Sequence, residues 1–455
     1  MSNITIVGAG YVGIVTGATF AYVGNNVTYL DIDEKKVRAL CEGAPPIHEP
    51  GLPELLQLVK PRLRCTTRYS EAVPNADFIF ICVGTPPSSD GNPDLRYVQD
   101  AATQIGLHLG PGYTQIINKS TVPIGSGNWV ESIVRDAFLS RNGHRPDGQF
   151  SVASNPEFLK EGSALADSFF PDRIVVGARD PKALNALTGL YRPLTDQAFN
   201  PPAFLPRPEG LGAVPLLTTD LASAELIKYA ANAFLATKIS FINEIGYLAE
   251  KVGADVAHIS RGIGLDSRIG HRFLSAGLGW GGSCFGKDTA ALVALGRDYN
   301  ALMPIVSAAR DVNCRMREWA VDRLQQELKI LKGRTVGILG VSFKPNTDDI
   351  RDAPALDIAM RLIGRGAKVR AHDPVALTRA RSELLSDQLR YCSEAEEVFT
   401  EADAVIVATE WQDYRDLPWN SLRSKMNIPF VLDGRNCLDS ESLESFGFRY
   451  VGVGR

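Results

Sequence analysis

The residue whose surroundings most strongly suggest chemistry is Cys284. It lies in residues 277–288 (GLGWGGSCFGKD), where five of the first ten residues are glycine. Glycines let the backbone approach a ligand closely and leave the thiol uncrowded. A helix that begins near Cys284 would favour its thiolate through the helix dipole, and Lys287 would add a positive charge. Asp288 would then follow one turn later on the same face, so the segment predicts a nucleophilic cysteine with a carboxylate beside it.

The other cysteines have no such surroundings, and we expect them to be inert buried residues: Cys41, Cys65, Cys82, Cys314, Cys392 and Cys437. The total of seven is odd, and the sequence contains no Cys-x-x-Cys or Cys/His pairing. This usage favours reduced thiols in the cytoplasm over a disulfide framework, and it predicts no metal site.

A second group of reactive side chains lies on a predicted helix. Residues 221–251 contain no proline and a single glycine, and Asp220 stands where an N-cap would. Glu225, Lys228 and Asn232 fall on one face of this helix, at i, i+3 and i+7. Either Glu225 and Lys228 form an ion pair on a solvated face, or the apolar neighbours bury Lys228 and lower its pKa. So long a helix also predicts a buried scaffold or a dimer-forming element.

A glycine pattern near the N-terminus predicts a dinucleotide site. Gly8, Gly10 and Gly13 stand between a predicted strand and an apolar helix. They permit a tight turn, a close approach of the backbone to a pyrophosphate, and close packing of helix on strand. Asp31 ends the next strand, where a carboxylate accepts hydrogen bonds from ribose hydroxyls and repels a 2′-phosphate. The pattern therefore predicts NAD in preference to NADP.

Three further segments each leave a predicted strand at the edge of the sheet where ligands bind. Residues 83–86 (VGTP) and 120–123 (STVP) are expected to contact the cofactor. Residues 155–162 (NPEFLKEG) carry two carboxylates, Glu157 and Glu161. By itself this last pattern is equally compatible with a capped helix start and with a catalytic segment.

The elements that must position these residues follow an alternating pattern. Short β-branched runs bounded by Gly, Pro or Asp occur at residues 4–7, 26–30, 78–83, 115–118 and 150–153, with helical stretches between them. Such alternation predicts a parallel sheet covered by helices on both faces. The pattern recurs at residues 334–339, 368–373 and 402–409. We therefore predict the α/β class, with two doubly wound, Rossmann-like domains joined by a long central helix in a helical domain.

The second copy differs from the first at its opening turn. Residues 337–344 (GILGVSFK) lack the three-glycine pattern, so this turn is a poor dinucleotide site, and Lys344 suggests a bound phosphate. Residues 199–217 are rich in Pro and Gly, which predicts a surface loop.

The composition excludes several classes of protein. The formal charge of −4 and the absence of a Lys/Arg block argue against a nucleic-acid partner. No apolar run is long enough to span a bilayer, and the first residues show no basic stretch or cleavage site of a signal peptide. We expect a cytoplasmic protein that does not bind membranes.

The ordered motifs resemble those of the UDP-glucose/GDP-mannose dehydrogenases along nearly the whole chain. The matching segments are residues 8–13, 83–86, 120–123, 155–162, 171–174, 225–232, 264–270, 281–288 and 343–351. Within this family, Cys284-Phe285 and Pro171–Arg173 are similar to the UDP-glucose branch, which makes UDP-glucose the expected substrate. The family pattern implies an NAD-binding domain over residues 1–205, a central helical dimerisation domain over 206–318, and a UDP-sugar-binding domain over 319–455.

The resemblance also implies roles for individual residues. The catalytic groups would be the nucleophile Cys284, the sugar-binding and oxyanion-stabilising pair Lys228 and Asn232, the acid/base Glu157, and the water-ordering groups Thr121 and Asp288. The cofactor would contact Gly8, Gly10, Tyr11, Val12, Gly13, Asp31, Lys36, Val83, Thr85, Thr121, Glu161 and Arg351. The UDP-sugar would contact Glu157, Phe158, Leu159, Lys160, Lys228, Asn232, Arg268, Ser275, Gly277, Gly281, Phe343, Lys344 and Arg435.

The chemistry implied is a four-electron oxidation of the C6 alcohol to a carboxylate. One NAD accepts each hydride, and an aldehyde loses its hydride readily only after a nucleophile has added to it. Cys284 would therefore form a thiohemiacetal and then a thioester that water hydrolyses. Two alternatives remain open: a GDP-mannose 6-dehydrogenase with the same mechanism, and a catalytically silent NAD-binding scaffold.

The resemblance further implies a homodimer or larger homo-oligomer, because Arg268 matches an arginine supplied to the neighbouring subunit's site. The segment 199–217 departs from the shorter bacterial members of the family. Its role is not predicted.

Overall fold

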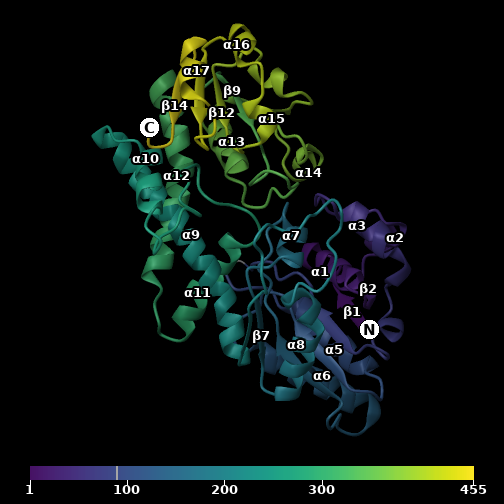
Figure 1. Cartoon of the computed structure of the whole chain (residues 1–455). Helices are drawn as coiled ribbons and strands as arrows, with labels where there is room; N and C mark the ends of the chain where they lie inside the picture. Colours follow the sequence, from purple (N-terminus) through teal and green to yellow (C-terminus); the bar gives the residue numbers. More distant parts are fainter. Residues whose placement is uncertain (89–90) are drawn as a thin grey trace. The chain divides into compact units, whose positions relative to one another are not determined.

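A computed structural model describes residues 1–88 and 91–455, which divide into two compact units, residues 1–230 and 231–455 (Figure 1). Each unit contains one sheet with helices packed on it, so the predicted α/β class with two doubly wound sheets is confirmed. The predicted domain boundaries at residues 205/206 and 318/319 stay a prediction.

The described part of the first unit forms one sheet of eight strands in the order β3-β2-β1-β4-β5-β6-β7-β8. All neighbours are parallel except β6 and β7, which are antiparallel. The strands are β1 (Asn3–Val7), β2 (Asn26–Leu30), β3 (Leu63–Thr66), β4 (Phe78–Ile81), β5 (Thr114–Asn118), β6 (Phe150–Ser154), β7 (Ile174–Ala178) and β8 (Leu216–Thr219).

Alternate side chains of these strands enter two cores, one on each face of the sheet. Ile4 and Ile6 of β1 belong to one core, whereas Val7 belongs to the other. The first core is completed by α1 (Tyr11–Tyr22), α3 (Leu52–Val59), α7 (Ala164–Phe169) and α8 (Pro181–Thr195), and the second by α4 (Tyr69–Ala72), α5 (Arg96–His108) and α6 (Ser126–Asn142). Helix α2 (Glu34–Glu42) lies between β2 and β3 in the chain. Because successive strand residues face opposite sides, burial on both faces requires the continuous apolar runs that the sequence contains.

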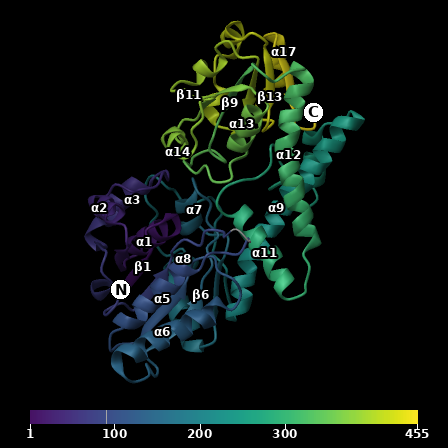
Figure 2. The same ribbon diagram turned by 180° about the vertical axis from the view of Figure 1, so that it is seen from behind.

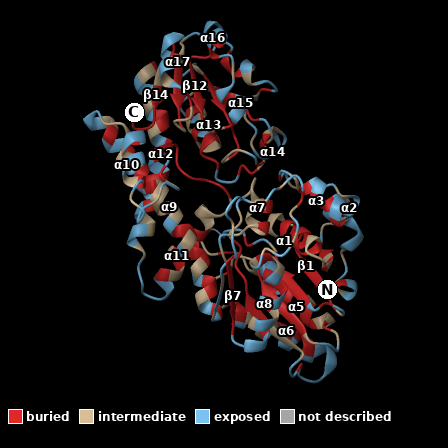
Figure 3. Ribbon diagram, in the orientation of Figure 1, coloured by how far each residue is buried: buried red, intermediate tan, exposed pale blue. Residues whose placement is uncertain are grey.

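Figure 2 shows α5 and α6 side by side, and they pack on each other along the second face. Figure 3 shows that the strands of both sheets are largely buried while the outer faces of the helices are exposed.

Residues 231–455, all of them described, form a second sheet of six parallel strands in the order β11-β10-β9-β12-β13-β14. The strands are β9 (Thr335–Leu339), β10 (Lys368–His372), β11 (Leu389–Tyr391), β12 (Ala404–Val407), β13 (Phe430–Asp433) and β14 (Arg449–Gly452). This order matches β3-β2-β1-β4-β5-β6 of the first sheet, as the repeated sequence pattern predicts.

Helices surround and precede this second sheet. They are α10 (Val256–Gly264), α11 (Phe285–Asp298), α12 (Pro304–Leu328), α13 (Pro354–Gly364), α14 (Leu377–Glu383), α15 (Gln412–Arg415), α16 (Trp419–Leu422) and α17 (Ser440–Ser445). The long helix α9 (Leu221–Val252) runs through both units. Its predicted N-cap is confirmed, because the Ser223 N–H donates to Oδ1 of Asp220 at 2.8 Å.

Two expectations need correction. The surface loop predicted over residues 199–217 ends early, because Leu216 and Leu217 begin the edge strand β8. The cysteines expected to be buried are not all so, since Cys41 and Cys314 are exposed. No helix in the described ranges is long and apolar enough to cross a membrane.

Candidate functional site

The glycine pattern forms the turn between β1 and α1. Gly8 has φ +103°, and a β-carbon there would lie 2.8 Å from the carbonyl oxygen of Cys82. A β-carbon at Gly13 would overlap the carbonyl oxygen of Gly8, so helix and strand pack as closely as predicted. Gly10 is the N-cap of α1 without a side-chain cap, and no atom lies within 4 Å of a β-carbon placed on it. The first N–H groups of α1, from Tyr11 and Val12 onward, therefore face a space that an anion fits.

Asp31 is held beside this turn at the end of β2. Its Oδ2 accepts from the Ala9 N–H at 2.7 Å and its Oδ1 accepts from the Asp33 N–H at 3.0 Å. The carboxylate is half-buried, which leaves acceptor positions for a ribose. Ile32, directly after it, is exposed.

The corresponding carboxylate of the second sheet is Asp373, after β10, and it is fully engaged. One oxygen, Oδ2, accepts from the Val341 N–H at 2.8 Å and from both the N–H and the hydroxyl of Ser342 at 2.9 and 2.8 Å. The other accepts from the backbone N–H groups of Val375 and Ala376. Because Asp373 has no acceptor position left for a ribose, the second sheet is a poor dinucleotide site, as its opening turn predicts.

The ends of β4 and β5 lie side by side, next to the turn that contains Gly8, Gly10 and Gly13. This turn is called the dinucleotide fingerprint. The Thr85 hydroxyl donates to the carbonyl oxygen of Thr121 at 2.8 Å, and the Ser120 hydroxyl donates to that of Val83 at 2.7 Å. The structure therefore brings these two predicted cofactor segments together at one edge of the sheet.

Lys228 pairs with a carboxylate far away in the sequence. Its Nζ lies 2.9 Å from Oε1 of Glu157, and both side chains are at most 7% exposed. Oε2 of Glu157 accepts from the Leu159 N–H at 2.9 Å. The ring of Phe158 lies next to this pair, with the Arg173 guanidinium 3.8 Å and Lys228 Nζ 5.5 Å from its centroid. Lys228 and the segment 155–162, which the sequence analysis identified separately, thus form one cluster.

The alternative of a Glu225–Lys228 ion pair on a solvated face is therefore wrong, and Lys228 is buried, as the other alternative expected. Glu225 instead accepts from the N–H groups of Gly125 at 2.7 Å and Gly127 at 2.8 Å, at the N-terminus of α6. Burial raises the pKa of Glu225 to about 7, although these two hydrogen bonds act in the opposite direction.

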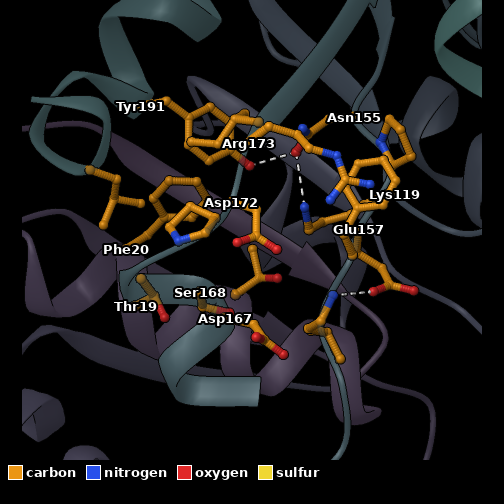
Figure 4. Close-up of a pocket in the computed structure, with 17 residues that line it drawn as sticks. Thr19, Phe20, Lys119, Asn155, Glu157, Asp167, Ser168, Asp172, Arg173 and Tyr191 are labelled. Carbon is orange, nitrogen blue, oxygen red and sulfur yellow. Dashed lines mark hydrogen bonds between the residues drawn. The ribbon is translucent and has the colours of Figure 1, made fainter. Parts of the chain in front are cut away.

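Two polar residues in this region, Lys119 and Tyr191, were missed by sequence reasoning. Lys119 Nζ donates to Oδ1 of Asn155 at 3.0 Å, and the Tyr191 hydroxyl donates to the same oxygen (Figure 4). Burial lowers the pKa of Lys119 to about 8. They line a pocket together with Glu157 and Arg173. The available signal was the position of Lys119, at the end of a strand and directly before the segment 120–123.

A further missed residue, Glu49, links the glycine turn to the segment 155–162. Its Oε2 accepts from the Tyr11 hydroxyl at 2.7 Å and from the Gly162 N–H at 2.6 Å. Burial and the adjacent Glu49 raise the pKa of Tyr11. The Tyr11 hydroxyl is thus already hydrogen-bonded within the protein.

Other predicted contacts of the first unit lie nearer the surface. Lys36 is exposed on α2, and Lys160 is exposed and pairs with Asp167 at 2.7 Å. Glu161 is half-buried, and its charge helps to raise the pKa of Tyr11.

In the second unit, Cys284 is the N-cap of α11, as predicted. The Asp288 N–H donates to the Cys284 carbonyl at 2.8 Å, which places the two side chains one turn apart. The thiol is half-buried, and the Ser283 hydroxyl lies 3.5 Å from its sulfur. A thiol at this position gains thiolate character from the free N–H groups of the helix.

Asp288 is fully buried between two donors. The Asn232 amide donates to Oδ2 at 2.6 Å, and Lys287 Nζ donates to Oδ1 at 2.6 Å. The positive charge of Lys287 is therefore committed to Asp288, and the carboxylate fixes the amide orientation of Asn232.

The glycine loop, residues 277–282, lies against the carboxyl ends of the second sheet's strands. Arg435 donates to the Gly279 carbonyl at 3.1 Å, and the Gly282 N–H donates to the Arg351 carbonyl at 2.9 Å. The Phe343 ring packs where a β-carbon of Gly282 would stand.

Most predicted sugar-nucleotide contacts of this unit therefore lie at one edge of the second sheet. Lys344 Nζ lies 5.5 Å from the Phe343 ring centroid at the same edge. Ser275 is exposed just before the glycine loop. Arg268 stands apart from this group, largely exposed and paired with Asp266 at 2.6 Å.

A Gly-x-Gly-x-x-Gly turn on a doubly wound sheet, together with a thiol at a helix N-terminus, defines a class of dinucleotide-dependent oxidoreductases with a covalent nucleophile. The comparisons with known proteins narrow this class. Residues 2–195, 222–315 and 337–440 match the NAD-binding, central and UDP-binding domains of the UDP-glucose/GDP-mannose dehydrogenase family. The chain belongs to this family.

Similar proteins cover the whole chain. It is 42% identical to the UDP-glucose 6-dehydrogenase TuaD of Bacillus subtilis (strain 168), over 100% of this chain and 94% of that protein. It is 43% identical to a UDP-glucose 6-dehydrogenase of Rhizobium meliloti (strain 1021), over 100% and 99%. The structure of a UDP-glucose dehydrogenase from Pyrobaculum islandicum superimposes with a TM-score of 0.88 at 40% identity, over 100% and 98%.

Proposed function

We propose that this chain oxidises the C6 alcohol of UDP-glucose to the carboxylate of UDP-glucuronate, with two NAD per sugar. The observation that carries the proposal is the pairing of a dinucleotide fingerprint with Cys284 at the N-terminus of α11, in a chain whose relatives are UDP-glucose 6-dehydrogenases over their full length. We place the reaction in the cytoplasm, where NAD and nucleotide sugars are available.

The residues of the first unit fit NAD. Gly10 leaves open space before uncapped helical N–H groups, which suits a pyrophosphate, and Asp31 keeps acceptor positions for ribose hydroxyls. Val83, Thr85 and Thr121 line the same edge of the sheet. NAD bound at these residues would supply the hydride acceptor for each oxidation step, with one NAD consumed per step.

Lys228 and Glu157 form the acid/base pair of the first unit. Their separation of 2.9 Å allows a proton to pass directly between them. The proton that the C6 hydroxyl loses therefore passes through Lys228 to the Glu157 carboxylate, and the Lys228 ammonium stabilises the alkoxide. Burial strengthens these interactions, because the local dielectric is low.

Cys284, Asn232 and Asp288 carry out the second half of the reaction. The Cys284 thiolate adds to the C6 aldehyde and gives a thiohemiacetal, whose loss of hydride leaves a thioester. Asn232 has one amide N–H committed to Asp288, so its other N–H is the one that donates to the C6 oxygen. The Asp288 carboxylate then orders the water that hydrolyses the thioester and frees the Cys284 sulfur.

The edge of the second sheet binds the UDP moiety. Lys344 and Arg435 supply positive charge and N–H donors for a diphosphate, and the glycine loop supplies backbone groups at close range. Both oxygens of Asp373 already accept hydrogen bonds within the protein, so the same edge is unsuitable for a second dinucleotide.

We also propose a homo-oligomer. In the second unit α9 exposes Phe234, Phe241 and Leu248 at i, i+7 and i+14, each at least 49% exposed. A stripe with this spacing fits the same helix of a second copy. Arg268 is 86% exposed at its side chain, which suits a residue that contributes to a neighbouring subunit's site.

The stoichiometry of NADH tests the covalent mechanism. Wild-type protein should form two NADH per UDP-glucose consumed, and GDP-mannose or UDP-N-acetyl sugars should give little. Cys284→Ala keeps the fingerprint and Lys228, so it should form at most one NADH per sugar and no acid. Cys314→Ala removes an exposed thiol of the same unit and should keep the ratio at two.

A Cys284→Ala protein that made UDP-glucuronate at near the wild-type rate would refute the thioester route. Faster turnover of GDP-mannose than of UDP-glucose would refute the substrate assignment while leaving the covalent mechanism intact.

A further inference from the structure

Asn313, on α12, binds both backbone polar groups of a single residue in the glycine loop. Its Oδ1 accepts from the Trp280 N–H at 2.7 Å, and its Nδ2 donates to the Trp280 carbonyl at 3.0 Å. The side chain is 2% exposed, so these hydrogen bonds are shielded from water. Two antiparallel hydrogen bonds fix both the position and the rotation of the Trp280 peptide units.

The backbone of the glycine loop passes close to the Asn313 amide. Gly279 has φ +98°, and a β-carbon there would lie 2.5 Å from Oδ1 of Asn313. The Trp280 carbonyl also accepts from Arg317 at 3.1 Å, so it receives two donors from the same helix. Arg317 in turn forms an ion pair with Asp352 at 2.8 Å. The loop backbone is thus held against α12 at one residue by two adjacent turns of that helix.

Trp280 passes this restraint on to the start of α11. Its indole Nε1 donates to the Ser240 hydroxyl at 3.1 Å, which fixes the ring. The ring packs edge-on against Phe285, with centroids 6.1 Å apart. Phe285 is the first residue of α11 and directly follows Cys284. Asn313 is therefore linked to Cys284 by two contacts: its hydrogen bonds to the Trp280 backbone, and the packing of the Trp280 ring on Phe285, the neighbour of Cys284.

We propose that Asn313 is a positioning residue for the Cys284 nucleophile. It touches neither the sulfur nor any residue assigned to the oxidation steps, and it acts by fixing the backbone of the glycine loop at Trp280. The inference rests on the proposed function, since it assumes that Cys284 must reach the C6 aldehyde before the aldehyde escapes. A shift of about 1 Å in such a group costs on the order of a hundredfold in rate.

The test uses two variants of the full-length protein. Asn313→Ala removes both hydrogen bonds. Asn313→Asp keeps the acceptor for the Trp280 N–H but sets an oxygen against the Trp280 carbonyl.

In both variants, amide hydrogen exchange across residues 278–286 should speed up at least tenfold. NADH formed per UDP-glucose consumed should fall from two towards one, with free aldehyde trapped by hydroxylamine, while KM for NAD stays within about twofold. A reduced fraction of folded protein lowers the rate but cannot change this ratio.

Asn436 provides a matched control, because it clamps Val453 in the same manner. Its amide donates to the Val453 carbonyl and accepts from the Val453 N–H, both at 2.9 Å. Asn436→Ala therefore removes an equivalent pair of hydrogen bonds in the same unit. It should leave the exchange of residues 278–286 and the ratio of two unchanged.

Unchanged exchange in both Asn313 variants would overturn the clamp. Faster exchange with a ratio of two would show that the clamp does not position Cys284. A wild-type ratio other than two would count against the proposed function itself, and the exchange data would still report on the clamp.

Discussion

Glu225→Gln should remove a pH-dependent part of the stability of the first unit. Glu225 is 3% exposed, and burial raises its pKa from 4.5 to about 7. The folded state therefore keeps this proton in a pH range where the unfolded chain has lost it. A raised folded pKa contributes stability that is fully present below the unfolded pKa and is lost as the pH rises through the folded pKa.

The magnitude follows from the shift in pKa from 4.5 to about 7. Glu225 should therefore contribute about 3 kcal/mol to the free energy of unfolding at low pH, and this contribution is lost as the pH rises through 7. Between pH 5 and pH 7, the wild-type free energy of unfolding minus that of Glu225→Gln should fall by about 1 kcal/mol per pH unit. Groups common to both proteins, including the nearby Asp220, cancel in this difference.

The assay is urea unfolding of both proteins at pH 5, 6, 7 and 8, followed by circular dichroism. Glu131→Gln on α6 serves as the control, because Glu131 pairs with Arg135 at the surface and its curve should run parallel to the wild type. The Gln amide also places a donor against the Gly125 or Gly127 N–H, which costs stability equally at every pH. Parallel pH curves for wild type and Glu225→Gln would refute the assignment of a raised pKa to this buried cap.

Three further outcomes are expected. Lys228→Met should lower kcat by roughly 10²–10³-fold with little change in NAD affinity measured by fluorescence titration, because it removes one alkoxide donor; a near-normal kcat would return Lys228 to a structural role. Asp31→Ser combined with Ile32→Arg should raise kcat/KM for NADP relative to NAD, since Ile32 is exposed next to the ribose acceptor, and an unchanged ratio would contradict this placement. Mixing Arg268→Ala with Cys284→Ala subunits should restore part of the NADH-forming activity that each lacks alone. If the mixture stays inactive although the subunits exchange, Arg268 does not complete a neighbouring site.

The sequence by itself determined the features that depend on local chain geometry. The fingerprint turn, the helix start at Asp220 and the position of Cys284 before α11 each involve residues within about two helical turns of one another. Their glycines, caps and apolar periodicity therefore carry the whole physical cause, and the structure places each where it is predicted. The alternating pattern also predicted the two sheets of buried strands, because strands buried on both faces must be apolar throughout, but it did not predict that β7 runs antiparallel to β6.

Only the tertiary structure decided which charged groups meet. Lys228 lies three residues from Glu225 in the sequence, yet it pairs with Glu157, 71 residues away, and Glu225 caps a helix 98 to 100 residues away. The bonds of Asn313 to the loop at Trp280 are likewise set by the packing of α12. A buried ion pair or clamp depends on strand order, register and the desolvation of both partners. These are properties of the assembled core, so spacing along the chain could identify the reactive residues but not their partners.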